Sequence, residues 1–367
     1  MEFRTAAGGP QGFRKRGGMA WSGVNWMVRH GLIRRQGPAV SAKAVAAPAV
    51  KSAPALRIAT SNTKGTMADQ GTVTNRTSDQ DGTQSAPAAP KTRGDARIVV
   101  IGNQKGGSGK STTTMHVIAA LMATGARVAS IDLDARQGTL SRYIENRQSY
   151  ITRTGTELPM PTHRAIEPST VASIDVARAH DAHAVEKAVT DLSTRHDYIV
   201  IDTPGTDNFL SRVGHSYSDT LITPLNDSFV DLDVLATIDP ETYAMVRPSK
   251  YAEMVFQVKM QKARRDKSNR TFEWIVMRNR TGQLDSRNQR AMDEALGKLS
   301  GRIGYRLVAG FSERVIFREL FLDGLTLLDL RNPGTDIKMN MSHLAARQEV
   351  RDLMAAIGLD KAEAIGA

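Results

Sequence analysis

One glycine-rich segment constrains the fold of this chain more than any other feature. It runs Asn103-Gln104-Lys105-Gly106-Gly107-Ser108-Gly109-Lys110-Ser111-Thr112, directly after an apolar run at 98–101 and before a helical pattern over 111–124. Glycines allow successive backbone N–H groups to point at phosphate oxygens, and the N-terminus of the following helix adds partial positive charge. The segment therefore predicts a strand, a phosphate-binding loop and a helix, in that order.

The residue types in this loop suit ATP and Mg²⁺. Lys110 is expected to neutralise the β- and γ-phosphates, and the Ser111 hydroxyl to ligate the metal. The other expected nucleotide contacts are Gly106, Gly107, Ser108, Gly109 and Thr112. A standard loop of this kind has glycine where this chain has Gln104, and the additional Lys105 matches the deviant form Lys-Gly-Gly-x-Gly-Lys-Ser/Thr instead.

Acidic residues end two of the later apolar runs. The run at 128–133 ends in Asp132-Leu133-Asp134, and the run at 198–201 is followed by Asp202-Thr203-Pro204-Gly205. In an open parallel sheet, the carboxyl ends of the strands line the ligand crevice, so both acidic ends are expected near the phosphate loop. We expect Asp202 and Asp132 to join Ser111 at Mg²⁺, and Asp134 to orient the attacking water. Lys105, Lys110 and Asp134 are the expected catalytic residues.

Short apolar runs alternate with helical patterns from residue 97 onward, which predicts an α/β fold with a doubly wound, mostly parallel sheet. The expected strands are 98–101, 128–133, 198–201, 220–223, 274–277 and 305–308. The expected helices are 111–124, 138–148, 182–195, 230–246, 284–300, 312–321 and 342–357. The Lys/Arg-rich stretch 258–270 is expected to be an exposed insertion.

Residues 1–94 form a compositionally separate extension before the domain at 95–367. The extension holds 14 Lys or Arg against 4 Asp or Glu and is rich in Ala, Gly, Pro, Ser and Thr, which predicts disorder. Two alternatives stay open: an organellar transit peptide, because the first third is basic, or a start codon assigned too early, with Met67 as the true start.

A second basic segment lies inside the domain. Residues 247–318 hold 17 Lys or Arg against 7 Asp or Glu, an asymmetry that predicts a surface for a polyanion. Arg287 and Arg290 are three residues apart and share a helix face. The candidate contacts to double-stranded DNA, made to phosphates without base recognition, are Arg278, Arg280, Arg287, Arg290 and Arg314. A solvated helix face is the alternative.

Taken together, these motifs resemble the ParA/MinD group of ATPases, and within it the MipZ family. The stretches 226–231, 277–280, 314–321, 324–330 and 343–349 are similar to that family's own blocks. The resemblance implies an ATP-dependent homodimer in which Lys105 reaches the partner's phosphates, and an adenine contact from Asn279. It also implies a cytoplasmic, nucleoid-associated bacterial protein that binds non-specific DNA and ParB and inhibits FtsZ polymerisation to place the division site.

Other members of the group, and other classes, fit the sequence less well. The chain has no cysteine, which excludes the branches that hold an iron–sulfur cluster. The last 26 residues mix acidic with basic side chains, so membrane anchoring is not expected. Two alternatives remain: a ParA-type partition ATPase, and a metabolic enzyme such as an ATP-dependent carboxylate ligase, which would not need Lys105 to act across a dimer.

Overall fold

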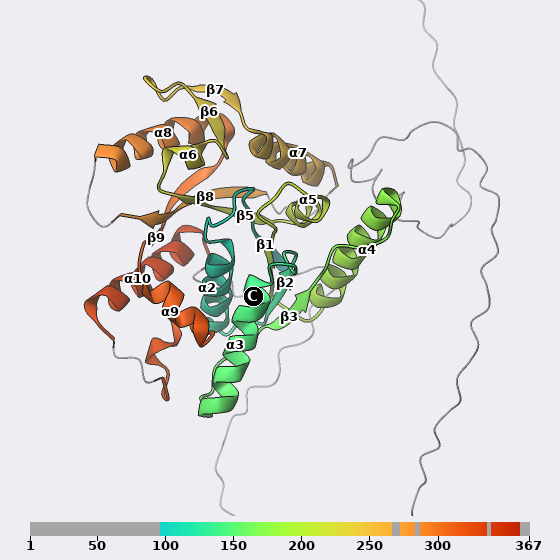
Figure 1. Cartoon of the computed structure of the whole chain (residues 1–367), viewed down its shortest axis with the longest axis vertical. Helices are drawn as coiled ribbons and strands as arrows, with labels where there is room; N and C mark the ends of the chain where they lie inside the picture. The colour runs from blue at the N-terminus through green and yellow to red at the C-terminus, as the bar shows by residue number, and fades with distance from the viewer. Residues whose placement is uncertain (1–95, 266–271, 283–286, 336–338, 360–367) are drawn as a thin grey trace, which may run out of the picture. The chain divides into compact units, whose positions relative to one another are not determined.

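Seven parallel strands form the central sheet of the protein (Figure 1). The computed structural model describes residues 96–265, 272–282, 287–335 and 339–359, so the extension expected at 1–94 and the alternative start at Met67 lie outside them. The strand order is β3-β2-β4-β1-β5-β8-β9. The strands are β1 (Arg97–Ile101), β2 (Val128–Asp132), β3 (Thr162–Ala165), β4 (Tyr198–Asp202), β5 (Thr220–Asn226), β8 (Glu273–Thr281) and β9 (Arg306–Ser312). The expected α/β fold with a parallel sheet is confirmed.

Helices cover both faces of this sheet, as its buried apolar strands require. One face packs against α4 (Ile174–Ser193), α5 (Phe209–Ser216), α7 (Lys250–Arg265) and α8 (Arg287–Ile303). The other packs against α2 (Lys110–Ala123), α3 (Thr139–Thr154), α9 (Ile316–Leu322) and α10 (Met341–Ala356), as Figure 1 shows. The 3₁₀-helix η1 (Asp329–Arg331) precedes α10. Within the described ranges, no helix is both long and apolar enough to cross a membrane.

The helix expected over 230–246 is wrong. The structure has a four-residue helix, α6 (Phe229–Leu232), and then an antiparallel hairpin of β6 (Ala236–Ile238) and β7 (Met245–Pro248). The residue before a proline disfavours helical backbone, and Asp239 precedes Pro240. The Asp239 carboxylate instead accepts hydrogen bonds from the backbone N–H groups of Glu241 and Thr242, at 3.1 and 2.8 Å, which closes a turn.

The expected exposed insertion at 258–270 is also wrong as far as residue 265, because this part belongs to helix α7. Val258 is buried in the core. Lys262 is buried as well: it forms an ion pair with Asp219 and donates a hydrogen bond to the backbone oxygen of Ser218 at 2.8 Å. Residues 266–270 lie outside the described part of the chain. The stretch is therefore part of a packed helix and not an insertion, although Lys259 and Arg264 are exposed on it, as its charge predicts.

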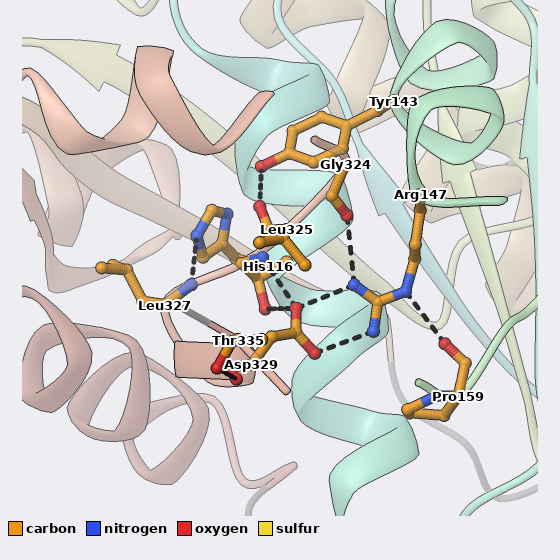
Figure 2. A network of polar contacts seen from close by, with 10 residues as sticks. His116, Tyr143, Arg147, Pro159, Gly324, Leu325, Leu327, Asp329 and Thr335 are labelled. Carbon is orange, nitrogen blue, oxygen red and sulfur yellow. Dashed lines mark hydrogen bonds and ion pairs between the residues drawn. The ribbon is translucent and has the colours of Figure 1, made fainter. Parts of the chain in front are cut away.

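A buried ion pair joins helix α3 to the segment that precedes α10 (Figure 2). The guanidinium of Arg147, with no exposed side-chain surface, donates two hydrogen bonds of 2.8 Å to the Asp329 carboxylate. It donates two more to the backbone oxygens of Gly324 and Pro159, at 3.1 and 3.0 Å. Although burial alone acts to raise it, the pKa of Asp329 is lowered, because Arg147 and Thr326 donate hydrogen bonds to the ionised carboxylate.

This pair provides a test of the fold. We expect Arg147→Ala to lower the free energy of unfolding by about 3–5 kcal/mol, because it leaves the Asp329 charge buried and unpaired. The matched control is Arg153→Ala on the same helix, where the Arg153–Asp323 pair is exposed; it should cost less than about 1 kcal/mol. Urea denaturation measures both values. Equal losses in the two variants would contradict a structural role for the buried pair.

Candidate nucleotide-binding site

The phosphate loop lies at the carboxyl end of β1, in the middle of the sheet. Buried Asn103 anchors its first turn: the amide nitrogen donates to the Pro224 oxygen at 2.6 Å, and the amide oxygen accepts from the Lys105 N–H at 2.8 Å. At the other end, Gly109 has φ +86°, a left-handed conformation that glycine adopts without strain. Helix α2 begins at the next residue, Lys110, so its N-terminus faces the loop.

A cleft of about 710 Å³ opens beside the loop. Six of the eight expected nucleotide contacts line this cleft; the two that do not are Asn279 and the fully buried Ser108. The lining set is Gly106, Gly107, Gly109, Lys110, Ser111, Thr112, Leu133, Asp134, Arg136, Gln137, Thr139, Pro168, Pro204, Gly205, Thr206, Asn208 and Arg280. Burial lowers the pKa of Lys110, against the opposing effect of the Asp202 and Asp134 carboxylates. Basic groups and a helix N-terminus therefore surround this cleft, as a polyphosphate requires.

The buried Asp202 lies against Ser111, one of the residues that line the cleft. The Ser111 hydroxyl donates to the Asp202 carboxylate at 2.6 Å, and the Thr114 hydroxyl donates to the other carboxylate oxygen at 3.2 Å. Burial, with the nearby Asp132 charge, raises the pKa of Asp202 to about 7, although both hydroxyls act to lower it. Burying the negative charge of this carboxylate costs free energy, and a cation bound nearby would offset that cost.

Asp132 and Asp134 differ in their surroundings. Both oxygens of the buried Asp132 carboxylate already accept hydrogen bonds: one from the Asp134 N–H at 2.9 Å, the other from the Ser141 N–H and hydroxyl at 3.1 and 2.7 Å. Ser141 in turn contacts His163 at 3.0 Å. Asp134 lines the cleft and accepts a hydrogen bond from the Gly205 backbone. Asp132 therefore fixes the backbone at Asp134 through a hydrogen bond. The Asp-x-Asp spacing alone did not indicate this role.

Lys105 points away from this cleft and toward α6. Its ammonium group forms an ion pair with Asp231, whose side chain is only 4% exposed, whereas the Lys105 side chain is 35% exposed. The second Asp231 oxygen accepts a hydrogen bond from the Asn226 N–H at 3.2 Å. Sequence reasoning missed this role of Asp231. The only signal was its position in the 226–231 stretch, one of those similar to the MipZ family.

Asn279 closes the loop from strand β8. Its side-chain nitrogen donates to the Ser108 oxygen at 2.8 Å, so the amide nitrogen faces the loop. Asn279 also lines a second, smaller cleft of about 110 Å³ with Gly109 and Thr112, next to Phe311 and Phe317. The expected adenine contact therefore lies beside the phosphate loop, with aromatic side chains near it.

The five expected DNA contacts do not form one group. Arg278 pairs with Asp227 and Asp293, and its side chain is 12% exposed. Arg314 is 11% exposed and pairs with Glu349 at 2.8 Å. The remaining three are on or near the surface: Arg287 and Arg290 are exposed in the first turn of α8, and Arg280 lines both clefts. Arg278 and Arg314 are largely buried in ion pairs with acidic side chains, which charge counting cannot detect.

The loop geometry provides a test with a matched control. A methyl group at Gly109 would overlap the side-chain nitrogen of Asn279, and the left-handed backbone adds roughly 1–2 kcal/mol for any L-residue. Nothing lies within 4 Å of a methyl group at Gly106. We expect Gly109→Ala to lower the melting temperature of the nucleotide-free protein and Gly106→Ala to leave it nearly unchanged. Two equal melting temperatures would show that Asn279 does not pack against the loop.

Comparison with known proteins identifies the family of this chain. Residues 97–361 match the family described as ATPase MipZ. The chromosome partitioning protein ParA of Myxococcus xanthus (strain DK1622) is 26% identical over 160 residues, 39% of this chain and 56% of that protein. The sporulation initiation inhibitor protein Soj of Bacillus subtilis (strain 168) is 25% identical over 160 residues, 39% of this chain and 63% of that protein. The chain thus spans less than two thirds of the length of these relatives.

Among solved structures, the ATP complex of a McdA variant from Cyanothece is 15% identical to this chain. It superposes with a TM-score of 0.47 over 72% of this chain and 97% of that one. The family match covers more than half of the sequence and includes the phosphate loop, the acidic strand ends and Asn279. The chain belongs to the MipZ family of ATPases.

Proposed function

We propose that this protein is an ATP-dependent dimeric switch that binds chromosomal DNA and ParB and regulates division-site placement by inhibiting FtsZ polymerisation. The observation that carries the proposal is the family match over residues 97–361, joined to a phosphate loop that retains both Lys105 and Lys110. Features of the site support the nucleotide, dimer and DNA parts of the proposal, and the ParB and FtsZ parts rest on the family match.

The cleft fits ATP with Mg²⁺. Mg²⁺ favours oxygen ligands and is usually bound by one or two carboxylates together with the phosphates of a substrate. Ser111, which lines the cleft, and the buried Asp202 supply a hydroxyl and a carboxylate oxygen 2.6 Å apart. Both oxygens of Asp132 already accept hydrogen bonds, so we propose that Asp132 acts on the metal through its charge and not as a direct ligand. When bound, the ion would offset the charge that develops on the phosphates.

Hydrolysis requires a residue that orients water. Asp134 lines the cleft close to Lys110, and burial raises its pKa together with the neighbouring Asp132 charge, against the lowering effects of Lys110 and the Gly205 N–H. We propose that Asp134 orients the attacking water while Lys110 stabilises the transferred phosphoryl group. Replacing Asp134 with alanine should then keep ATP binding and slow turnover.

Lys105 is the residue proposed to act across the dimer. In the single chain it is held by Asp231, at a site where about a third of the lysine side chain remains exposed. A partly exposed ion pair is a weak constraint, so a phosphate group of a partner's nucleotide could replace the carboxylate. Dimerisation would thereby depend on bound ATP.

The first turn of α8 is the proposed DNA surface. Arg287 and Arg290 are exposed there on one helix face, and a dimer would present two such faces. Contacts of this type bind phosphates without sequence preference and weaken steeply as salt rises. Arg278 and Arg314 are not part of this proposed surface, because carboxylates already pair with them.

FtsZ polymer mass is the measurement that tests the function. The full chain carrying Asp134→Ala, which should accumulate as the ATP dimer, is mixed with FtsZ and sedimented, with the same protein lacking nucleotide as the control. We expect polymer mass to fall only with ATP present. If FtsZ is indifferent while ATP still drives retention on DNA, the division-regulator proposal fails and the ParA-type partition ATPase takes its place.

A further inference from the structure

Strand β8 ends in an irregular segment that redirects one arginine. The pairing of β8 with β9 shifts register on both sides of Asn279, between Met277 and Thr281. The next residue, Arg280, has φ +52°, a left-handed backbone that a non-glycine residue rarely adopts. Strand irregularities next to active sites commonly re-aim a side chain, and strained residues of this kind concentrate at ligand sites.

Arg280 lines both clefts of the nucleotide site. It borders the 710 Å³ cleft around Lys110 and the 110 Å³ cleft beside Asn279. Three residues are common to the two clefts: Gly109, Thr112 and Arg280. Arg280 therefore lies where the two clefts meet, beside the last residue of the phosphate loop and the first turn of α2.

Arg280 is exposed in the clefts, where Asp134 and Glu313 are the acidic residues among the described lining. Among the residues that the structure describes, no carboxylate forms an ion pair with it, whereas two residues earlier Arg278 is held by both Asp227 and Asp293. The exposed guanidinium at the mouth of the clefts thus has unused N–H donors. A planar guanidinium can donate two parallel hydrogen bonds to the oxygens of one phosphate group.

We propose that Arg280 binds the α-phosphate of the nucleotide, and is not a DNA contact. The inference rests on the proposed ATP site: the loop and Lys110 occupy the side of the β- and γ-phosphates, Asn279 occupies the side of the base, and the junction corresponds to the phosphate nearest the ribose. Three consecutive residues of β8 then have three different roles. Arg278 ties the strand to α8, Asn279 ties it to the loop, and Arg280 ties it to the nucleotide.

Calorimetric titration of the full chain with ADP and, separately, with the ATP analogue AMPPNP tests this assignment without DNA. The variants are Arg280→Ala, Arg280→Lys, and Arg302→Ala as a control that removes an exposed arginine at the far end of α8. Because both nucleotides carry an α-phosphate, we expect Arg280→Ala to weaken both about tenfold, which corresponds to about 1.4 kcal/mol. Arg280→Lys should recover part of the loss, and Arg302→Ala should bind like the wild type.

Several outcomes would overturn the assignment. Unchanged affinity of Arg280→Ala for both nucleotides would exclude a nucleotide contact, and a loss confined to AMPPNP would move the contact to the γ-phosphate. A melting temperature equal to that of the wild type is required to attribute the loss to binding. In a second arm, retention on DNA at saturating AMPPNP should fall for Arg287→Ala with Arg290→Ala but not for Arg280→Ala; the reverse would restore Arg280 to the DNA surface. Failure of the wild type to bind either nucleotide would instead reject the proposed function.

Discussion

Parallel register among β1, β2 and β4 is the constraint on which the rest of this site depends. Asp202 pairs with Ile101 on one side and with Asp132 on the other, so all three strands end at the same level. The loop that leaves β1 must then pass the carboxylates that leave β2 and β4 before α2 can begin. The hydrogen bond from Ser111 to Asp202 joins the start of α2 to the end of β4. A shift of one residue in either pairing would turn a carboxylate to the opposite face of the sheet.

Ion pairs decide which charges of this domain are available to a ligand. Asp227 and Asp293 hold the largely buried Arg278, and Glu349 holds the largely buried Arg314, whereas the Lys105 side chain stays 35% exposed beside Asp231. Arg280, by contrast, lies at the junction of the two clefts. The nucleotide site therefore draws on strand β8, and the proposed DNA surface lies on helix α8. Arg278 joins these two elements directly, because it pairs with Asp293 of α8.

Local sequence patterns predicted the parts of the fold that depend on local chemistry. The phosphate loop, the apolar strands and the acidic strand ends have fixed spacings, because the backbone N–H groups, the buried sheet faces and the ligand crevice each demand particular residue types. The apolar residues in 230–246 also fit a helical period, so this pattern alone does not predict the hairpin after α6; Asp239-Pro240 is the local signal for its turn. The partners of Lys105, Arg278 and Lys262 could not be predicted, since Asp231, Asp293 and Asp219 reach them only through tertiary contacts.

The central claim is that nucleotide binding at this loop controls association through Lys105. Sedimentation velocity of the full chain, with and without ATP and Mg²⁺, tests it most directly when wild type and Lys105→Ala are compared. The account predicts a wild-type dimer only with ATP, and a variant that remains monomeric although calorimetry shows that it still binds ATP. An ATP-dependent dimer of normal affinity in Lys105→Ala would contradict the account and favour a P-loop enzyme of the metabolic class.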